Sequence, residues 1–536
     1  MWVTTAATAP YVGRVLLDNQ EAAYVGRVLL DPPTPGLEST RPAYVAENRT
    51  DATAELPRAT VDTSEVKLTG RTIHVTAGED FQAALDQAKP GDSILLDPGQ
   101  TYRGPFQLPK KDGDGWILIG SAASRGLPAP GHRVDPSHKP LMAKLVSSRD
   151  TVIAADPAAH HYRFVGIEIA PADGTFLYSL VQLGDDESKA EKLPHHIIFD
   201  RCYLHGDPAK GTRRGIAMNS RDTAVVNSYL SDFKEVGADS QAIAAWNGAG
   251  PFKIANNYLE AAGENVMFGG ADPSIPDLVP SDIEVTRNHM SKPLGWRMAD
   301  PSFQGAAWTV KNLFELKNAR RVLVDGNLFE NNWAHAQNGF AILFTPRNQK
   351  GGAPWSVVED VTFSNNVVRH AGAGINILGR DDNQASRQTR RILIRNNVFV
   401  DVGGRWGGNG RLFQLLDGTS GVVIDHNTAS QTGGIVFGGD HAPHDRFVFQ
   451  NNAMPDNHAG FVGSGTAAGK STIDRYFPDA VIRGNAFVGG NAADYPVDNF
   501  FPASVEAVKR YAAQTADRRP PGADLRQIPV NLNESE

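Results

Sequence analysis

Two stretches of the chain carry charged side chains of the kinds that acid–base catalysis uses. Glu315 and Lys317 are separated by one residue within an apolar run, and Arg380 precedes two aspartates. A lysine can serve as a base, an arginine can hold a carboxylate, and a histidine such as His335 can return a proton to a leaving oxygen. These groups suit the removal of a proton beside a carboxylate, followed by β-elimination. The candidate catalytic residues are Lys317, Arg380, Glu315 and His335.

The same carboxylates allow other interpretations. Glu315 with Asp381 or Asp382 would supply the two carboxyl groups that glycoside hydrolysis needs, at a separation of about 5 to 9.5 Å. Charges of both signs on one face also form ordinary surface ion pairs. The charge pattern alone therefore leaves a lyase, a hydrolase and a non-catalytic surface open.

Aromatic and amide side chains in the same part of the chain are candidates for contacts with a carbohydrate. Five of the eight tryptophans lie between positions 246 and 355. Flat aromatic faces stack on sugar rings, although tryptophan is also a packing residue beneath long loops. The candidate substrate-binding residues are Trp246, Asn265, Trp333, Asn338, Asn376, Asp381 and Gln414.

A proline-rich acidic segment, 263–282, is a candidate calcium site. Glu264, Asp272 and Asp282 offer the carboxylate oxygens that calcium prefers. Their spacing matches no defined calcium loop, and ordinary acidic turn residues would give the same composition. We take these three residues as candidate metal ligands and calcium as the candidate cofactor.

An internal repeat between residues 195 and 490 decides the fold. Each copy is a short alternating strand, a polar residue at the turn, a glycine-rich stretch and a second apolar strand. One such unit cannot bury its own apolar face, so the copies must stack. The equivalent turn position, at intervals of 25 to 39 residues, is occupied by Cys202, Ser228, Asn257, Asn288, Asn327, Asn366, Asn397, Asn427, Asn452 and Asn485.

Stacking predicts where the side chains of the repeat point. Strands in register lie about 4.8 Å apart, so the recurring asparagines should form a hydrogen-bonded column inside the stack. Aligning the second strands by their inward apolar pairs places one set of polar residues on a common outer face: Asn265, Glu315, Lys317, Asn376 and Gln414. The same alignment puts Arg380 in the column of Lys317, two coils or about 10 Å away.

This pattern is typical of a right-handed parallel β-helix, and from about residue 70 to 500 the chain resembles the pectate-lyase-like β-helix superfamily. The amphipathic segment 80–88 resembles the helix that caps the N-terminal end of that fold. We expect an all-β solenoid of roughly ten or more coils over 66–500. An N-terminal extension, 1–65, contains a duplicated Tyr-Val-Gly-Arg-Val-Leu-Leu-Asp segment, and we expect a capping helix and tail over 501–536.

The resemblance implies a polysaccharide substrate held in a groove on the solenoid, and a secreted or periplasmic location. Related lyases often use calcium. The motifs typical of β-helix polygalacturonases are absent, and Ala442-Pro-His-Asp445 matches the epimerase motif Asp-Pro-His-Asp only in part. We therefore expect a polysaccharide lyase acting on an acidic glycan. The alternatives are a glycoside hydrolase of the same fold and a non-catalytic, adhesin-like glycan-binding rod.

Composition excludes several other classes of protein. The 536 residues contain 52 Lys and Arg against 60 Asp and Glu, a net charge of −8, with no long basic tract for nucleic acid. No apolar run reaches the 18 residues of a membrane span. Cys202 is the single cysteine, so neither an intrachain disulfide nor a site of several thiolates can form. We expect a monomer.

Overall fold

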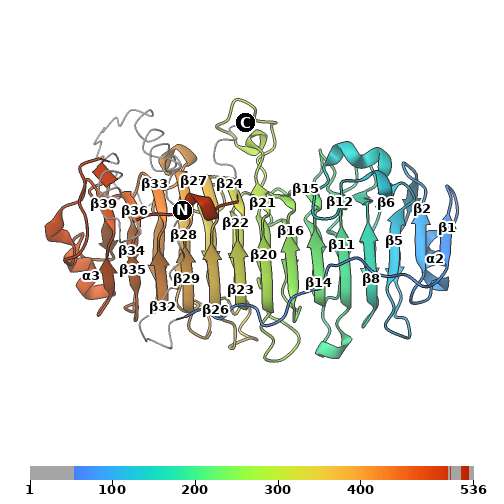
Figure 1. Cartoon of the computed structure of the whole chain (residues 1–536), viewed down its shortest axis with the longest axis horizontal. Helices are drawn as coiled ribbons and strands as arrows, with labels where there is room; N and C mark the ends of the chain where they lie inside the picture. The colour runs from blue at the N-terminus through green and yellow to red at the C-terminus, as the bar shows by residue number, and fades with distance from the viewer. Residues whose placement is uncertain (1–52, 505–506, 509–520, 530–536) are drawn as a thin grey trace, which may run out of the picture.

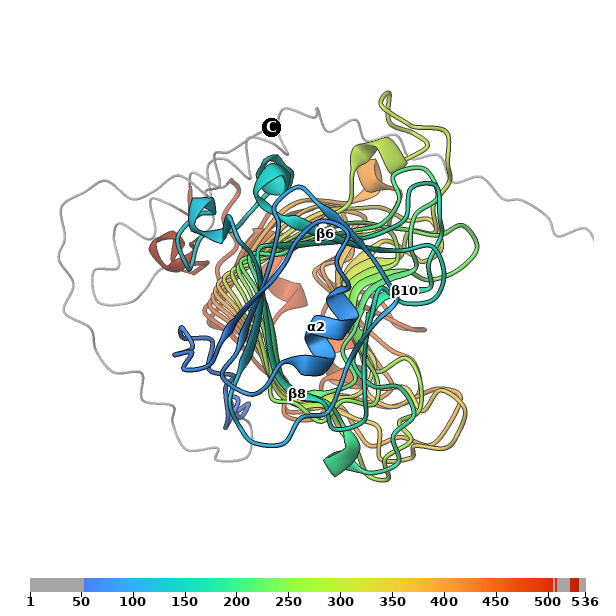
Figure 2. The same ribbon diagram turned by 90° about the vertical axis from the view of Figure 1, so that its right-hand side faces the viewer.

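The computed structural model describes residues 53–504, 507–508 and 521–529. Three sheets, here called sheets A, B and C, run side by side along one axis with 14, 13 and 12 parallel strands (Figures 1 and 2). Neighbouring strands within a sheet come from successive coils, because each coil contributes one strand to each sheet. The protein is a right-handed parallel β-helix, as the repeat predicts. In the described part of the chain no helix is long and apolar enough to cross a membrane.

Sheet A begins at the N-terminal end of the solenoid. Its strands are β1 (Thr72–Val75), β2 (Ser93–Leu96), β5 (Ile117–Ser121), β8 (His160–Val165), β11 (His195–Asp200), β14 (Arg221–Val226), β17 (Phe252–Ala255), β20 (Ser281–Thr286), β23 (Ala319–Asp325), β26 (Val358–Ser364), β29 (Arg390–Arg395), β32 (Ser420–Asp425), β35 (Val448–Gln450) and β38 (Val481–Arg483).

Sheet B follows sheet A in each coil. Its strands are β3 (Thr101–Arg103), β6 (Ala143–Ser147), β9 (Ile167–Pro171), β12 (Tyr203–His205), β15 (Tyr229–Phe233), β18 (Tyr258–Ala261), β21 (His289–Ser291), β24 (Leu328–Asn332), β27 (Val367–Ala371), β30 (Val398–Val402), β33 (Thr428–Gln431), β36 (Ala453–Pro455) and β39 (Ala486–Val488).

Sheet C closes each coil. Its strands are β4 (Phe106–Leu108), β7 (Ile153–Ala155), β10 (Ser179–Gln182), β13 (Arg214–Ala217), β16 (Gln241–Ala245), β19 (Glu264–Phe268), β22 (Asn312–Leu316), β25 (Phe340–Phe344), β28 (Ala373–Leu378), β31 (Phe413–Leu416), β34 (Val436–Gly438) and β37 (Phe461–Gly463).

Short helices close the ends of the solenoid and interrupt its loops. The α-helix α2 (Phe81–Gln87) covers the N-terminal opening, as expected, with Asp80 accepting a hydrogen bond from the Ala83 N–H as its N-cap (Figure 2). At the other end, α3 (Lys470–Tyr476) buries Ile473 in the core. The 3₁₀ helices are η1 (Ser124–Gly126), η2 (Pro136–Leu141), η3 (Ala190–Lys192), η4 (Leu294–Trp296), η5 (Gly404–Trp406), η6 (Ala492–Asp494) and η7 (Leu525–Gln527). Much of 501–536, where the sequence predicts a C-terminal capping helix and tail, lies outside the described residues.

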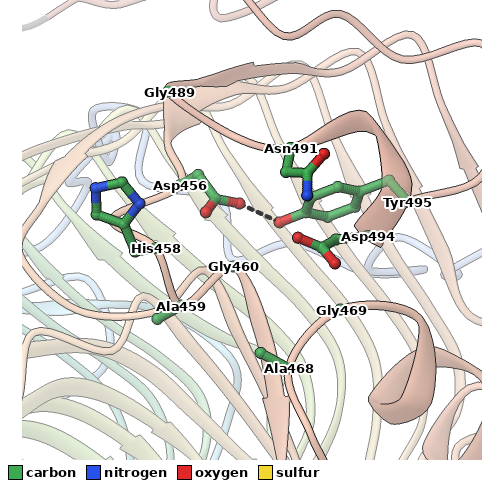
Figure 3. Close-up of a pocket in the computed structure, with 10 residues that line it drawn as sticks. All are labelled: Asp456, His458, Ala459, Gly460, Ala468, Gly469, Gly489, Asn491, Asp494 and Tyr495. Atoms are coloured by element: carbon green, nitrogen blue, oxygen red, sulfur yellow. Dashed lines mark hydrogen bonds between the residues drawn. The ribbon is translucent and has the colours of Figure 1, made fainter.

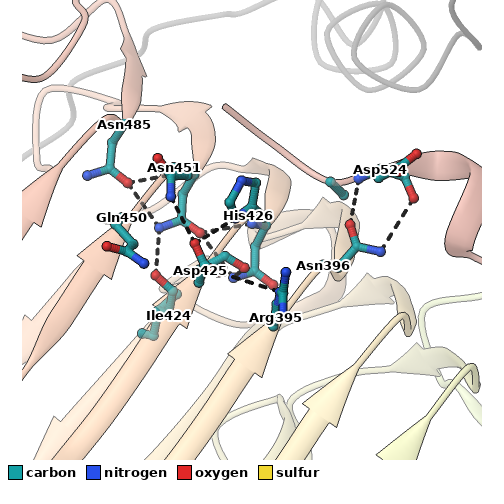
Figure 4. A network of polar contacts seen from close by, with 12 residues as sticks. Arg395, Asn396, Ile424, Asp425, His426, Gln450, Asn451, Asn485 and Asp524 are labelled. Carbon is teal, nitrogen blue, oxygen red and sulfur yellow. Dashed lines mark hydrogen bonds and ion pairs between the residues drawn. The ribbon is translucent and has the colours of Figure 1, made fainter. Parts of the chain in front are cut away.

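The predicted asparagine column is present at the turn from sheet A to sheet B. The backbone N–H of Asn288 donates to Oδ1 of Asn327 at 2.8 Å, and the N–H of Asn327 donates to Oδ1 of Asn366 at 2.9 Å. The column continues to Asn485, and Figure 4 shows part of it with the polar network beside it. The left-handed backbone conformation belongs to the residue before each column position, such as Asn365, and not to the column residue itself.

Both terminal segments lie against the solenoid, on sheets other than C. Residues 53–65 follow the outer face of sheet A, where the Glu55 N–H donates to Asp360 and the Arg58 N–H donates to Asp282 (Figure 1). Residues 521–529 return to sheet B, where Ile528 packs on Val367. The described terminal segments thus make these contacts with sheets A and B, and the outer face of sheet C lies apart from them.

Candidate functional site

A groove of about 370 Å³ crosses the outer face of sheet C over β22, β25 and β28 and reaches β31. It is lined by Glu315, Lys317, Ala336, Gln337, Asn338, Phe340, Leu343, Thr345, Arg347, Asn376 and Gln414. Five of these residues are candidates from the sequence: Glu315, Lys317, Asn338, Asn376 and Gln414. The structure brings them together in one place, while their individual roles stay predictions.

Strand alternation explains why these residues share one row. In β22, Phe314 and Leu316 are fully buried in the core, so Glu315 between them faces outward. Its register partner on β25 is Leu343, followed by Asn376 on β28 and Gln414 on β31. Three strand spacings separate the ends of this row, which is therefore about 14 Å long.

Glu315 and Lys317 form an ion pair at one end of the row. Nζ of Lys317 lies 3.5 Å from Oε1 of Glu315, and the two side chains are 15% and 2% exposed. The Asn312 amide donates to the other carboxylate oxygen, Oε2, at 3.2 Å. The carboxylate is thus fixed from two sides and holds the lysine amine at the groove.

Arg347 also lines the groove, although no sequence pattern predicted it. Its backbone N–H donates to the carbonyl oxygen of Lys317 at 2.8 Å, and Nη1 lies 2.6 Å from Oδ1 of Asp381 and also contacts Asp382. Burial disfavours the charged guanidinium, but the two aspartates outweigh this effect and raise the pKa of Arg347. Arg347 follows β25 in a loop, where no strand periodicity points to it.

Arg380 does not share the column of Lys317, so that expectation is wrong. Leu316 pairs with Phe344 and Phe344 pairs with Ile377, so Leu378 occupies the row of Lys317. Strand β28 runs on to Leu378 before the chain turns away. Arg380 follows in an exposed loop, where Nη1 donates to the Ser386 carbonyl at 3.4 Å.

Asn265 points into the solenoid, contrary to the expected outward position. Its amide donates to the carbonyl oxygens of Leu259 and Ser291 at 2.6 and 2.9 Å. The chain bends where β19 begins, so strict alternation fails there and both Asn265 and Val266 are fully buried.

The remaining sequence candidates lie outside the groove. Trp333 packs under a loop with Trp296 and Trp406, so its ring is buried. Trp246 is partly exposed on β16's C-terminal side, with the Arg214 guanidinium 4.9 Å from its ring centroid. His335 is exposed next to the groove segment 336–338, and its Nδ1 accepts a hydrogen bond from the Val310 N–H at 3.2 Å.

The three candidate calcium ligands have separate partners. Oε1 of Glu264, on sheet C, lies 2.8 Å from Nζ of Lys311. Asp272 accepts two backbone N–H groups at 2.9 Å, and Asp282, on sheet A, pairs with Arg321 at 2.7 Å. Because each carboxylate has its own partners, these three residues do not fit one calcium site.

Lys311 extends the charged surface towards the N-terminal coils. Its Nζ also lies 2.7 Å from Asp239, and the side chain is 11% exposed. Burial alone would lower the pKa of this amine, but the carboxylates of Glu264, Glu315 and Asp239 raise it instead. Lys311 therefore remains a firmly charged ammonium group and is unsuited to act as a base.

A second cavity, of about 240 Å³, lies at the C-terminal end of the solenoid (Figure 3). Asp456 accepts a hydrogen bond from the Tyr495 hydroxyl at its wall, and burial raises the pKa of Tyr495. His458 and Asp494 also line it. Its residues come from the last coils and the following loop, where the repeat weakens, so no sequence pattern points to this cavity.

No family model and no curated protein matches the chain. Among solved structures it is similar to the catalytic unit of a thermostable GH87 alpha-1,3-glucanase from Streptomyces thermodiastaticus, with 14% identity, a TM-score of 0.50, and coverage of 82% of this chain and 71% of that chain. It is also similar to an alginate lyase from Paenibacillus sp., with 16% identity, a TM-score of 0.36, and coverage of 66% and 99%. A mannuronic acid specific family 6 lyase from human gut microbiota matches with 10% identity, a TM-score of 0.40, and coverage of 84% and 96%.

Identities this low establish the fold alone. The chain is a parallel β-helix. What the β-helix does must be argued from its groove, because one fold hosts many chemistries.

Proposed function

We propose that this β-helix is a polysaccharide lyase that binds an acidic glycan in the groove of sheet C and cleaves it by β-elimination. The observation that carries the proposal is the placement of Lys317, paired with Glu315, directly beside Arg347 of the next coil. A base and a cation side by side are what proton removal next to a carboxylate requires. The substrate class implies a secreted or periplasmic protein.

In the proposed reaction Lys317 acts as the base. In its deprotonated form the Lys317 amine takes the proton from the sugar carbon that bears the carboxylate. The electron pair left behind forms a carbon–carbon double bond, and the glycosidic carbon–oxygen bond on the neighbouring carbon breaks. Glu315 holds Nζ in position, so removing its carboxylate misplaces the base without removing it.

Arg347 stabilises the charge that develops during this step. When the proton leaves, negative charge builds up on the sugar carboxylate, and a fixed guanidinium lowers the energy of that state. The ion pairs with Asp381 and Asp382 fix the guanidinium before substrate arrives. Preorganisation of this kind avoids reorientation during the reaction.

Polar groups along the row position the sugar chain. Nε2 of Gln414 donates to Oδ1 of Asn376 at 3.1 Å, and Arg411 donates to Oε1 of Gln414 at 2.8 Å. These amides present hydrogen-bonding groups to sugar hydroxyls over the length of the groove. We assign the return of a proton to the leaving oxygen to His335, which is exposed beside the segment 336–338.

The hydrolase alternative that pairs Glu315 with Asp381 is disfavoured by the burial of Asp381. Its side chain is fully buried, and besides Arg347 it accepts the Asn348 N–H at 2.8 Å. Both oxygens of this carboxylate are thus occupied, by the Arg347 guanidinium and by a backbone N–H, and neither is exposed to a substrate. Glycoside hydrolysis through this pair therefore lacks an accessible second carboxyl group.

Incubation with pectate, alginate and glycosaminoglycans tests the proposal. A lyase produces unsaturated uronates, which absorb in the ultraviolet, and one of these substrates should give that signal. Reducing ends that appear without the absorbance would establish hydrolysis instead. Glycan binding without any product would establish a binding protein, and either result would overturn the lyase assignment.

A further inference from the structure

Two histidine pairs occupy the same position on successive coils of sheet A, on a face of the β-helix other than the groove. His160 and His161 begin β8, His195 and His196 begin β11, and His160 is the register partner of His195. The rings stack in two columns. The centroids of His160 and His195 are 4.9 Å apart with an interplanar angle of 10°, and those of His161 and His196 are 4.4 Å apart at 17°.

Three of these imidazoles converge on one point. One ring nitrogen from each of His161, His195 and His196 lies within 4.8 Å of the others, and this is the only such group of three among the described residues. Nδ1 of His195 is 2.8 Å from Nδ1 of His196. A tetrahedral zinc ion with bonds of 2.0–2.1 Å holds its nitrogen ligands about 3.3 Å apart, so small side-chain rotations would complete the geometry.

The surroundings of the cluster suit a divalent cation. Trp116 makes T-shaped contacts with the rings of His161 and His196, whose centroids lie 5.1 and 6.3 Å from its own. Oδ2 of Asp222 lies 3.8 Å from Nδ1 of His196, which places negative charge beside the cluster. The histidines are partly buried, so they are held by packing and remain reachable from solvent.

Neutral imidazole is the form that binds a metal. A stack of histidine rings that hydrogen-bond to one another without a metal, as the Nδ1 atoms of His195 and His196 do, is the competing explanation.

We propose that His161, His195 and His196 bind one zinc ion, which links the coils of β8 and β11. Imidazole nitrogen suits zinc and its neighbours nickel and copper, whereas calcium and magnesium prefer oxygen. Three protein ligands leave a fourth position for water. The site is separate from the sheet C groove, so the proposal stands whether or not the groove is a lyase.

The test measures zinc binding by the full chain after treatment with a chelator and dialysis. Titration calorimetry with zinc chloride should show one site per chain, and bound zinc should raise the melting temperature. Cobalt(II) in place of zinc should give the absorption bands of a tetrahedral ion. Calcium chloride should give no signal, and calcium binding as tight as zinc binding would contradict the assignment.

Single replacements locate the site. His161→Gln and His196→Gln should each weaken zinc binding about tenfold or more, since outer-sphere changes alone reach that size. His441→Gln is the matched control, because His441 is 86% exposed and pairs with Asp417 far from the cluster. Absence of binding by the unaltered chain, or equal binding by all three variants, would overturn the proposal. Circular dichroism identifies a variant that fails to fold, and the remaining single variant then decides.

Discussion

Nζ of Lys317 lies 3.5 Å from Oε1 of Glu315 on the outer face of sheet C. Glu315 lies in β22 and Lys317 follows directly after that strand, yet the groove they face is completed by residues from three further coils. The ion pair alone would be an ordinary surface contact. The proposed role of this ion pair in β-elimination depends on its position next to Arg347 and beside the amides of Asn376 and Gln414.

Replacing Lys317 tests the assignment of the base. Lys317→Ala should lower the rate of ultraviolet product formation by about 10²–10⁴-fold, the usual contribution of a general base. Lys470→Ala is the matched control, because Lys470 is 72% exposed at the other end of the β-helix. If Lys317→Ala retains full activity while the control does too, Lys317 is not the base.

The two arginines give opposite expectations. Arg347→Lys keeps the charge but loses the fixed fork of N–H donors, and we expect a loss in kcat of about 10²-fold. Arg380→Lys should leave kcat nearly unchanged, because Arg380 lies in an exposed loop. Steady-state kinetics on the same glycan compares them. A large loss for Arg380→Lys with little loss for Arg347→Lys would assign the carboxylate-binding role to Arg380 and remove Arg347 from the mechanism.

The asparagine column should dominate local stability. Asn327 is fully buried and accepts the Asn288 N–H at 2.8 Å, so Asn327→Ala leaves a buried donor without its partner. We expect a loss of about 1–3 kcal/mol in the free energy of unfolding, measured by urea denaturation. Asn383→Ala, at an exposed loop position, should change it by less than about 0.5 kcal/mol. Equal effects would contradict the column's role.

Glu330 links stability to pH. Burial opposes its charge, but His289 and Arg369 lower its pKa to about 2 from 4.5. Because the pKa of Glu330 is lower in the folded chain, its ionised carboxylate stabilises the fold. This stabilisation is complete above about pH 4.5 and is lost as the pH falls towards 2. Glu330→Gln should therefore flatten the decline in stability between these values, which denaturation at stepped pH measures. An unchanged pH profile would show that Glu330 makes no such contribution.

The sequence repeat predicted the structural features that recur in successive coils. The asparagine column and the inward pairs of sheet C follow from spacing, because parallel strands in register must align equivalent residues. Glu315, Asn376 and Gln414 were placed correctly for the same reason. The alignment failed at Asn265 and Arg380, which stand where strands bend or end and alternation no longer holds.

Loops account for what the sequence analysis missed. Arg347 follows β25, and its place in the groove depends on ion pairs to Asp381 and Asp382 from another loop. Trp333 is a predicted substrate-binding residue, but its ring is buried against Trp296 and Trp406 under neighbouring loops. Such contacts depend on how separate loops fold over the sheet, and no local periodicity encodes them.

The segment 53–65 changes how the rod should come apart. In a solenoid each coil normally touches only its neighbours, so fraying can start at either end. Here one stretch of chain is fastened to Asp360 on β26, to Asp282 on β20 and, through Arg163, to β8. This single segment therefore connects coils that are far apart in the stack. Peeling the first coils requires this tie to release, so we expect the N-terminal two thirds of the rod to unfold as one cooperative unit.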